Sequence, residues 1–234
     1  MIVTYLCYTK CIATMMLNLS FLEKVPQEYF CVYEGSTDSF PCKPAEFCSD
    51  PTVTSYQPNM DLKDSFENWV GKLGLTCASP GKIGLIGSAY FIGWIITLTF
   101  VPRISDLYGR QKIIIGGNFI QVLAFTAIMV TENYRLMIAA LVVLGMVATS
   151  RAQVSVIYLY ESLTKEHFVT TYAICSCMEG IFGLLGSIYF VFISKNWFWL
   201  LFGAYVLQVI GTIGVCFFPE SPKYLVKSGQ LVAA

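Results

Sequence analysis

The chain has 234 residues, of which 56% are hydrophobic, 15% aromatic and only 13% charged, about half the charged share of an average globular protein. Fifteen basic residues balance fifteen acidic ones, whereas a nucleic-acid-binding protein carries a clustered positive excess and a disordered segment is less hydrophobic. With a mean hydropathy of +0.62, the composition predicts an intrinsic membrane protein that binds no nucleic acid.

The first predicted transmembrane helix covers residues 1–22, where the only charged residue is Lys10. A cleaved signal peptide is the alternative. Signal peptides begin with a basic region and end at a small-x-small cleavage motif, but here the single cation lies in the middle of the segment and no Ala-x-Ala motif follows. We therefore favour a transmembrane helix.

A polar segment follows over residues 23–82 and holds six of the nine prolines and four of the nine cysteines. An even number of cysteines in a polar loop indicates two disulfides, and hence an oxidising compartment. The pairing stays open, because four cysteines allow three pairings. A zinc site is the alternative, which the absence of histidine and of Cys-x-x-Cys in the segment disfavours. We expect an extracytosolic loop with disulfides among Cys31, Cys42, Cys48 and Cys77.

Residues 83–218 contain five more apolar stretches, and a bilayer needs about 20 residues of helix for each crossing. Three stretches are uncharged, and each of the other two contains one charged residue: 83–102, 113–131, 136–160 with Arg151, 168–194 with Glu179, and 196–219. The predicted fold class is an all-α membrane protein with six transmembrane helices and a cysteine-bearing loop between helices one and two. Residues 219–234 then form a cytosolic segment and tail.

The distribution of Lys and Arg predicts the orientation, because short inner connections are enriched in these residues. The predicted inner connections hold six such residues, and the short outer ones hold two, Arg135 and Lys195. We therefore expect a multi-pass protein with both termini in the cytosol, or in the matrix of an organelle. The membrane itself is not identified by the sequence.

A short polar turn is predicted between the second and third helices. Gly109 can adopt a positive φ for a sharp reversal, and Asp106 and Arg110 are placed to pair with each other or with helix ends. After the sixth helix, residues 219–225 read Pro-Glu-Ser-Pro-Lys-Tyr-Leu. The prolines end the helix, and Glu220 can accept hydrogen bonds from a neighbouring turn.

These two motifs resemble those of a known family. Asp106-x-x-Gly109-Arg110-x-Lys112 is similar to the signature between helices two and three of the major facilitator superfamily. The block at 219–225 resembles the Pro-Glu-Ser-Pro-Arg-Trp-Leu block of its sugar-porter and organic cation transporter branches, and the cysteine-bearing loop is similar to that of the organic cation transporters. The resemblance covers the N-terminal six-helix half of a twelve-helix fold.

The resemblance implies alternating-access transport of a small organic solute, organic cation or sugar-like, with a second six-helix half as partner. It also implies a cytosolic gate made by Asp106, Gly109, Arg110, Lys112, Glu161 and Glu220. Pro102, Leu107 and Phe168 depart from the family pattern. Leu107 and Phe168 stand where the family usually has a cation, so the resemblance implies a weaker charge network in the cytosolic gate. The alternative is a non-transporting structural or accessory subunit of a larger membrane complex, organellar and for example mitochondrial, derived from a transporter half.

The ionisable residues inside the spans are candidate cavity groups, because a charge in a membrane segment is costly. Arg151 and Glu179 fall at similar depths on neighbouring antiparallel helices, which predicts an ion pair. This pair is either a functional element of the cavity or a neutral strut between the helices. Trp94 offers an aromatic face to a cation, and Gln121 either lines the cavity or bonds to another helix.

An enzymatic function is not expected. The chain has one histidine, His167, and no Gly-x-Gly-x-x-Gly or Walker A motif. A catalytic triad, a multi-histidine metal site and a nucleotide-binding loop therefore all lack their residues. The sequence predicts no cofactor and no metal.

Overall fold

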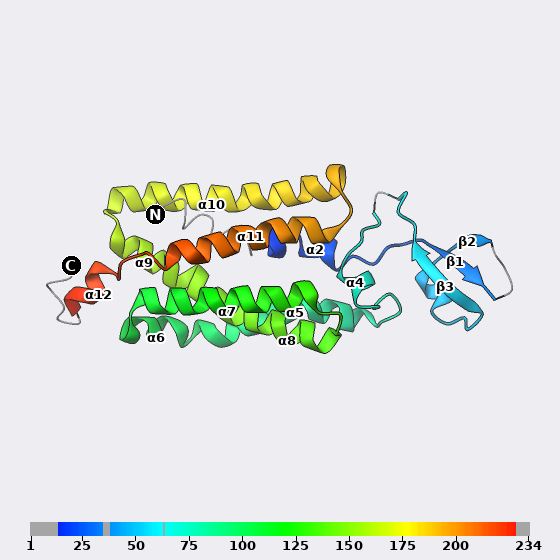
Figure 1. Ribbon diagram of the computed structural model, residues 1–234, viewed down its shortest axis with the longest axis horizontal. Helices are drawn as coiled ribbons and strands as arrows, with labels where there is room; N and C mark the ends of the chain where they lie inside the picture. The colour runs from blue at the N-terminus through cyan, green and yellow to red at the C-terminus, as the bar shows by residue number, and fades with distance from the viewer. Residues whose placement is uncertain (1–13, 35–37, 63, 228–234) are drawn as a thin grey trace.

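The computed structural model describes residues 14–34, 38–62 and 64–227. It consists of a long helical bundle with a small sheet-bearing module at one end (Figure 1). Most of the first predicted helix, residues 1–22, lies outside the described residues. Its last part is helical and ends with α2 (Leu19–Leu22).

Within the described residues, five helical segments are long and apolar enough to cross a membrane, and they match the five stretches expected between residues 83 and 218. The elements are α5 (Pro80–Leu98), α7 (Arg110–Val130), α8 (Tyr134–Thr149) continued by η1 (Ser150–Val154) and α9 (Ser155–Ser162), α10 (Lys165–Ile188) continued by η2 (Tyr189–Ile193), and α11 (Trp197–Val215). The short α6 (Val101–Tyr108) joins α5 to α7, and α12 (Pro222–Lys227) follows α11.

Helices α5 and α8 cross in direct backbone contact. A Cβ atom placed at Gly93 of α5 would collide with the backbone of α8 at Val142, and one placed at Gly145 of α8 would collide with the carbonyl of Tyr90 on α5. Small residues allow this close approach. In a bilayer the hydrophobic effect does not favour contact between helices, so van der Waals contacts of this kind stabilise their association.

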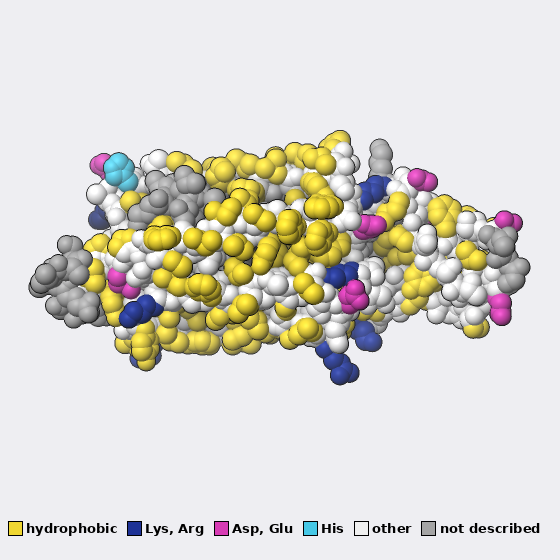
Figure 2. All heavy atoms as spheres, viewed as in Figure 1, with side chains coloured by type: hydrophobic (Ala, Val, Ile, Leu, Met, Phe, Trp, Pro, Cys, Tyr) yellow, Lys and Arg dark blue, Asp and Glu magenta, His cyan; other side chains and the backbone are white. Residues whose placement is uncertain are grey.

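The outside of the bundle is apolar. Large hydrophobic side chains point outward from α10, η2 and α11, with Phe192 81% exposed and Ile193 71% exposed. Hydrophobic side chains cover the helical part of the face shown in Figure 2, and charged side chains gather near its ends. This distribution fits a surface solvated by lipid, and the chain is an integral membrane protein.

The polar segment folds around a three-stranded antiparallel sheet with the order β2-β1-β3, which was not predicted from the sequence. The strands are β1 (Tyr29–Tyr33), β2 (Ser39–Cys42) and β3 (Val53–Pro58), and the short helices are α3 (Pro44–Phe47) and α4 (Trp69–Lys72). Disulfides join Cys31 to Cys42 and Cys48 to Cys77. The two expected disulfides are therefore confirmed, their pairing is resolved, and the four cysteines are not metal ligands.

Two lysines attach the polar segment that carries the sheet to the helix ends nearest to it. The Lys72 ammonium donates to the carbonyls of Ile128 and Met129, at 3.0 and 2.9 Å. These carbonyls lie at the C-terminal end of α7, where the helix dipole favours a cation. Lys195, between η2 and α11, donates to the Leu62 carbonyl at 2.6 Å. Lys72 therefore satisfies carbonyls that the end of α7 leaves free, and Lys195 holds the loop at Leu62 against the start of α11.

Candidate functional site

The turn from α6 into α7 lies at the end of the bundle opposite the sheet (Figure 1). Gly109 makes this turn with a φ of +99°, in the left-handed region that favours glycine. A Cβ atom at this position would also lie 2.6 Å from Oε2 of Glu220. The position therefore requires glycine for two separate reasons, backbone conformation and space.

Arg110, the first residue of α7, bonds carboxylates from two other parts of the chain. Its Nη2 lies 2.7 Å from Oδ1 of Asp106, one turn earlier, and its Nη1 pairs with the carboxylate of Glu161 at the end of α9. The side chain of Glu161 is only 3% exposed, whereas that of Asp106 is 51% exposed. The Arg110–Glu161 pair is therefore shielded from solvent, and loss of either residue would remove the least exposed ion pair of this group.

Glu220 caps the N-terminus of α7. Its Oε1 accepts hydrogen bonds from the backbone N–H groups of Arg110 at 3.1 Å and of Gln111 at 3.0 Å. The first N–H groups of a helix have no partner within the helix, and a negative charge is favourable there. The Gln111 side chain in turn donates to the carbonyl of Phe218. The segment after α11 is thereby fixed to the start of α7.

Glu161 joins this segment to α9 as well. Ser221 Oγ donates to its Oε2 at 2.7 Å, and Lys223 Nζ lies 3.6 Å from its Oε1. On the same side, the Tyr158 hydroxyl of α9 donates to the Pro219 carbonyl at 2.7 Å. A cavity of about 220 Å³ opens within the cluster, lined by Asp106, Arg110, Glu161, Lys223 and Tyr224. The cluster therefore links three segments of the chain.

The structure brings five of the six expected gate residues together; Lys112 is exposed and forms no ion pair with any residue that the structure describes. Gln111, Tyr158 and Ser221 also belong to the cluster and were not predicted from the sequence. Ser221 had a signal, since it lies inside the Pro-Glu-Ser-Pro block. Tyr158 had no such signal, because nothing in the sequence around it indicates a contact with the Pro219 carbonyl.

The candidate cavity charges lie on two helical segments, Arg151 in η1 and Glu179 in α10. Arg151 lies in η1, is 8% exposed and reaches the Tyr90 hydroxyl with Nη2 at 3.5 Å. The ion pairs formed among residues 14–34, 38–62 and 64–227 do not include one between Arg151 and Glu179, and the pairing of these two residues stays a prediction. The prediction used only depth along the two helices, which does not fix the direction in which a side chain points.

The two other cavity candidates lie on different helices. Gln121 on α7 is 1% exposed, one turn from Asn118, whose Oδ1 accepts from Gln208 of α11 at 3.0 Å. Asn118 and Gln208 therefore form a polar contact between α7 and α11 close to Gln121, as is common between membrane helices. Trp94 on α5 is half-buried, and its Nε1 has no hydrogen-bond partner in the described part of the chain.

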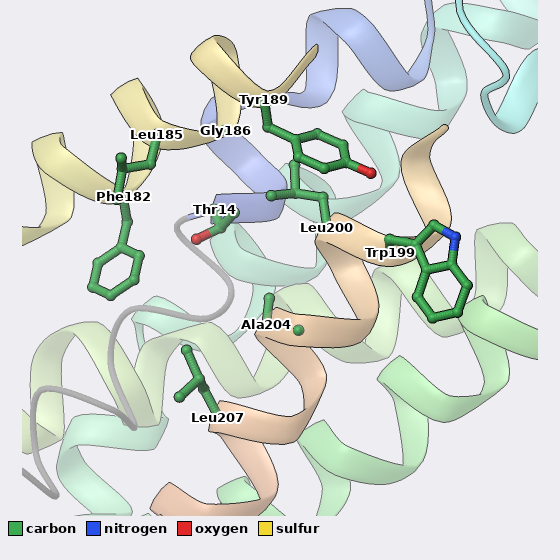
Figure 3. A pocket seen from close by; sticks show the side chains of 10 residues that line it. Thr14, Phe182, Leu185, Gly186, Tyr189, Trp199, Leu200, Ala204 and Leu207 are labelled. Carbon is green, nitrogen blue, oxygen red and sulfur yellow. The ribbon is translucent and has the colours of Figure 1, made fainter. Parts of the chain in front are cut away.

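A second, apolar cavity of about 300 Å³ lies between α10, η2 and α11. Figure 3 shows Phe182 and Leu185 on one side of it and Leu200 and Leu207 on the other, with the Thr14 hydroxyl nearby. Among the residues that the structure describes, no charged side chain lines it. Its apolar lining suits a hydrocarbon group, in contrast to the charged cluster at the bundle end.

When the chain is compared with models of known protein families, one model matches it. The family model described as sugar (and other) transporter matches residues 29–234. YwtG of Bacillus subtilis, named as a metabolite transport protein, is 25% identical over 161 residues, covering 68% of this chain and 35% of the relative.

Two other relatives have names that give a substrate. The organic cation/carnitine transporter 2 of Mus musculus is 24% identical over 167 residues, covering 68% of this chain and 29% of the relative. The glucose transporter GlcP of Staphylococcus epidermidis is 24% identical over 154 residues, covering 64% and 34%. The chain therefore spans about a third of the length of these relatives.

Proposed function

The chain belongs to the sugar (and other) transporter family of the major facilitator superfamily, and on this premise we propose that it forms one half of a membrane carrier for a small organic solute. In this proposal a second six-helix half supplies the opposite wall of a central pathway, and the two halves rock about it in alternating access. The solute is an organic cation or a sugar-like molecule.

The observation that carries the proposal is the cluster around Glu161. Its carboxylate is held by Arg110, Ser221 and Lys223, which come from the start of α7 and from the segment after α11. A shielded ion pair that links separate segments has two well-defined states, formed and broken, and such bistable contacts are what a conformational switch uses. The cluster acts as a latch on one conformation of the carrier.

The orientation is part of the proposal. The disulfides belong in an oxidising compartment, and they lie in the module at the opposite end from the cluster (Figure 1). The excess of Lys and Arg in the connections at the cluster end agrees with this orientation. The gate therefore faces the cytosol, or the matrix in an organelle, and so do both termini.

The test is solute uptake with a single change in the latch. The protein is reconstituted into liposomes at the length at which it occurs in its source membrane, and uptake of labelled tetraethylammonium and glucose is followed. Glu161→Gln removes the charge that pairs with Arg110, so we expect the uptake rate to change at least about tenfold, since one broken shielded pair shifts a two-state equilibrium by more than 1.4 kcal/mol.

The matched control is Glu166→Gln, an exposed carboxylate at the start of α10 and outside the cluster. It should leave the rate unchanged. If the Glu161→Gln protein folds and transports at the wild-type rate, the cluster around Glu161 does not act as a latch. If no solute is taken up in a saturable manner by the folded wild type, the structural-subunit alternative replaces the carrier.

A further inference from the structure

The two disulfides differ in exposure. Cys31 and Cys42 are 0% and 4% exposed and lie in the apolar core of a lobe that is formed by the three strands and α3, residues 29–34 and 38–58. Cys48 and Cys77 are both exposed. Thiol–disulfide exchange requires that a thiolate reach a sulfur of the disulfide. In the folded protein, the Cys48–Cys77 disulfide is therefore accessible to a thiol in solution and the Cys31–Cys42 disulfide is not.

The exposed disulfide joins two separately packed parts of the molecule. Cys48 follows Phe47 at the end of α3, and the Phe47 ring stacks on the Tyr56 ring with centroids 4.6 Å apart, so Cys48 belongs to the lobe. Cys77 lies three residues before the start of α5. The apolar core of the lobe is separate from that of the bundle, which includes Leu75. The disulfide therefore ties an independent unit to the beginning of a membrane-spanning helix.

The lobe meets the rest of the chain at a narrow neck. The chain enters it after Glu28 and leaves it at Asn59, whose N–H donates to the Glu28 carbonyl at 3.1 Å. A cavity of about 350 Å³ lies between Tyr29 and Tyr56 of the sheet and Trp197 at the start of α11. The strands extend beyond the end of the bundle (Figure 1). Without the disulfide, the lobe is free to turn about this neck.

We propose that the Cys48–Cys77 disulfide is a site of reversible exchange with a low-molecular-weight thiol such as glutathione, and that its reduction releases the lobe from α5. The lobe keeps its own core and the Cys31–Cys42 disulfide, so it stays folded after release. The proposal concerns the compartment that the lobe faces and does not depend on which solute the protein carries.

The exchange takes two steps. The thiolate of one small thiol attacks a sulfur of the pair, the S–S bond breaks, and the departing cysteine sulfur leaves as a thiolate that takes a proton from water. A second small thiolate then attacks the small-molecule sulfur of the mixed disulfide and frees the other cysteine, which is also protonated. The protein gains two electrons and two protons, and the two small thiols are oxidised to their disulfide.

Differential alkylation of the purified full chain in detergent tests the selectivity. Free thiols are first blocked with N-ethylmaleimide, reduced glutathione is added, and samples are quenched with iodoacetamide, digested and analysed by mass spectrometry. We expect Cys48 and Cys77 to be labelled at least about tenfold faster than Cys31 and Cys42, because a buried disulfide reacts only after local opening. The matched control is the same reaction in denaturant, where the two disulfides should react at similar rates.

Hydrogen exchange then distinguishes release from unfolding. The N–H of Ala78, next to Cys77, donates to the Leu75 carbonyl at 2.9 Å. It should lose protection after selective reduction, while the ladder between β1 and β3 stays protected. Oxidised glutathione should restore the protection of Ala78. Cys48→Ser/Cys77→Ser should show the released pattern without any thiol, and the wild-type result decides if this variant does not fold.

Three results would overturn the inference. The first is reduction of both disulfides at the same rate in the folded protein, or of neither. The second is loss of protection in the β1–β3 ladder, which would mean that the Cys48–Cys77 disulfide is needed for the fold of the lobe. The third is unchanged protection at Ala78 after reduction, which would mean that the lobe is not released. Each result is independent of solute uptake, so failure of the carrier proposal would leave the test intact.

Discussion

The carboxylate of Glu220 occupies the space that a side chain at position 109 would need. A Cβ atom at Gly109 would lie 2.6 Å from Glu220 Oε2, while Oε1 of the same carboxylate caps the first N–H groups of α7. Two motifs more than 100 residues apart in the sequence therefore form one unit, in which the glycine of one makes room for the acid of the other.

Gly109→Ala should destabilise the protein. The substitution forces a Cβ into the left-handed region at about 1–2 kcal/mol and displaces a carboxylate that accepts two helix N–H groups, at about 1 kcal/mol for each hydrogen bond. We expect a clearly lower thermal unfolding midpoint in detergent. Gly116→Ala on α7, where a Cβ meets nothing, is the control and should be neutral or slightly stabilising. Equal midpoints for the two variants would refute the proposed steric role of Gly109.

Arg110 and Glu161 should show strong coupling in a double-mutant cycle. Glu161→Met removes one of the two carboxylates that pair with the Arg110 guanidinium, which is 12% exposed and keeps Asp106 as a partner, and the change should cost about 1–3 kcal/mol. Arg110→Met/Glu161→Met removes both charges and should cost less than the sum of the two single changes. The measurement is the unfolding free energy of the wild type and the three variants. Additive effects would mean that the pair contributes no mutual stabilisation.

The disulfides predict a specific peptide map. Digestion without reduction should give linked peptides joining Cys31 to Cys42 and Cys48 to Cys77. Replacing Cys48 and Cys77 together by serine opens a loop with a sequence separation of 29, and the stability loss should be roughly 3–4 kcal/mol on the loop-entropy relation. A linked peptide joining Cys31 to Cys48 would contradict the fold of the module.

Glu23 should make stability depend on pH. Burial raises the pKa of its carboxyl from 4.5 to about 7, an effect that the backbone of Gly87 offsets only in part. Between these values the folded state binds more protons than the unfolded state, so the free energy of unfolding falls as pH rises from 4.5 to 7.

Glu23→Gln removes this titration, and the variant should lose less stability than the wild type between about pH 5 and about pH 8. The measurement is the unfolding midpoint at both pH values, with Glu166→Gln as the exposed control. Parallel changes in wild type and Glu23→Gln would show that Glu23 does not titrate in this range.

The spans and the cysteine-bearing loop could be predicted because hydropathy and residue spacing are local properties of the sequence. The pairing of Cys31 with Cys42 could not, because it depends on how β1 and β2 lie side by side. Most of the bundle-end cluster followed from the family resemblance, although Tyr158 did not, since its contact with the Pro219 carbonyl arises only from tertiary packing. The Arg151–Glu179 pairing stays a prediction, since depth along the two helices does not fix the direction in which either side chain points.

Saturable solute uptake is the most direct test of the central claim that this chain is part of a carrier. The protein is taken from its source membrane, reconstituted into liposomes and offered labelled tetraethylammonium, 4-(trimethylammonio)butanoate and glucose, with folding verified by intact disulfides. The carrier proposal predicts saturable uptake of at least one solute above that of empty liposomes. Uptake equal to that of empty liposomes for all three would contradict it and favour a structural subunit.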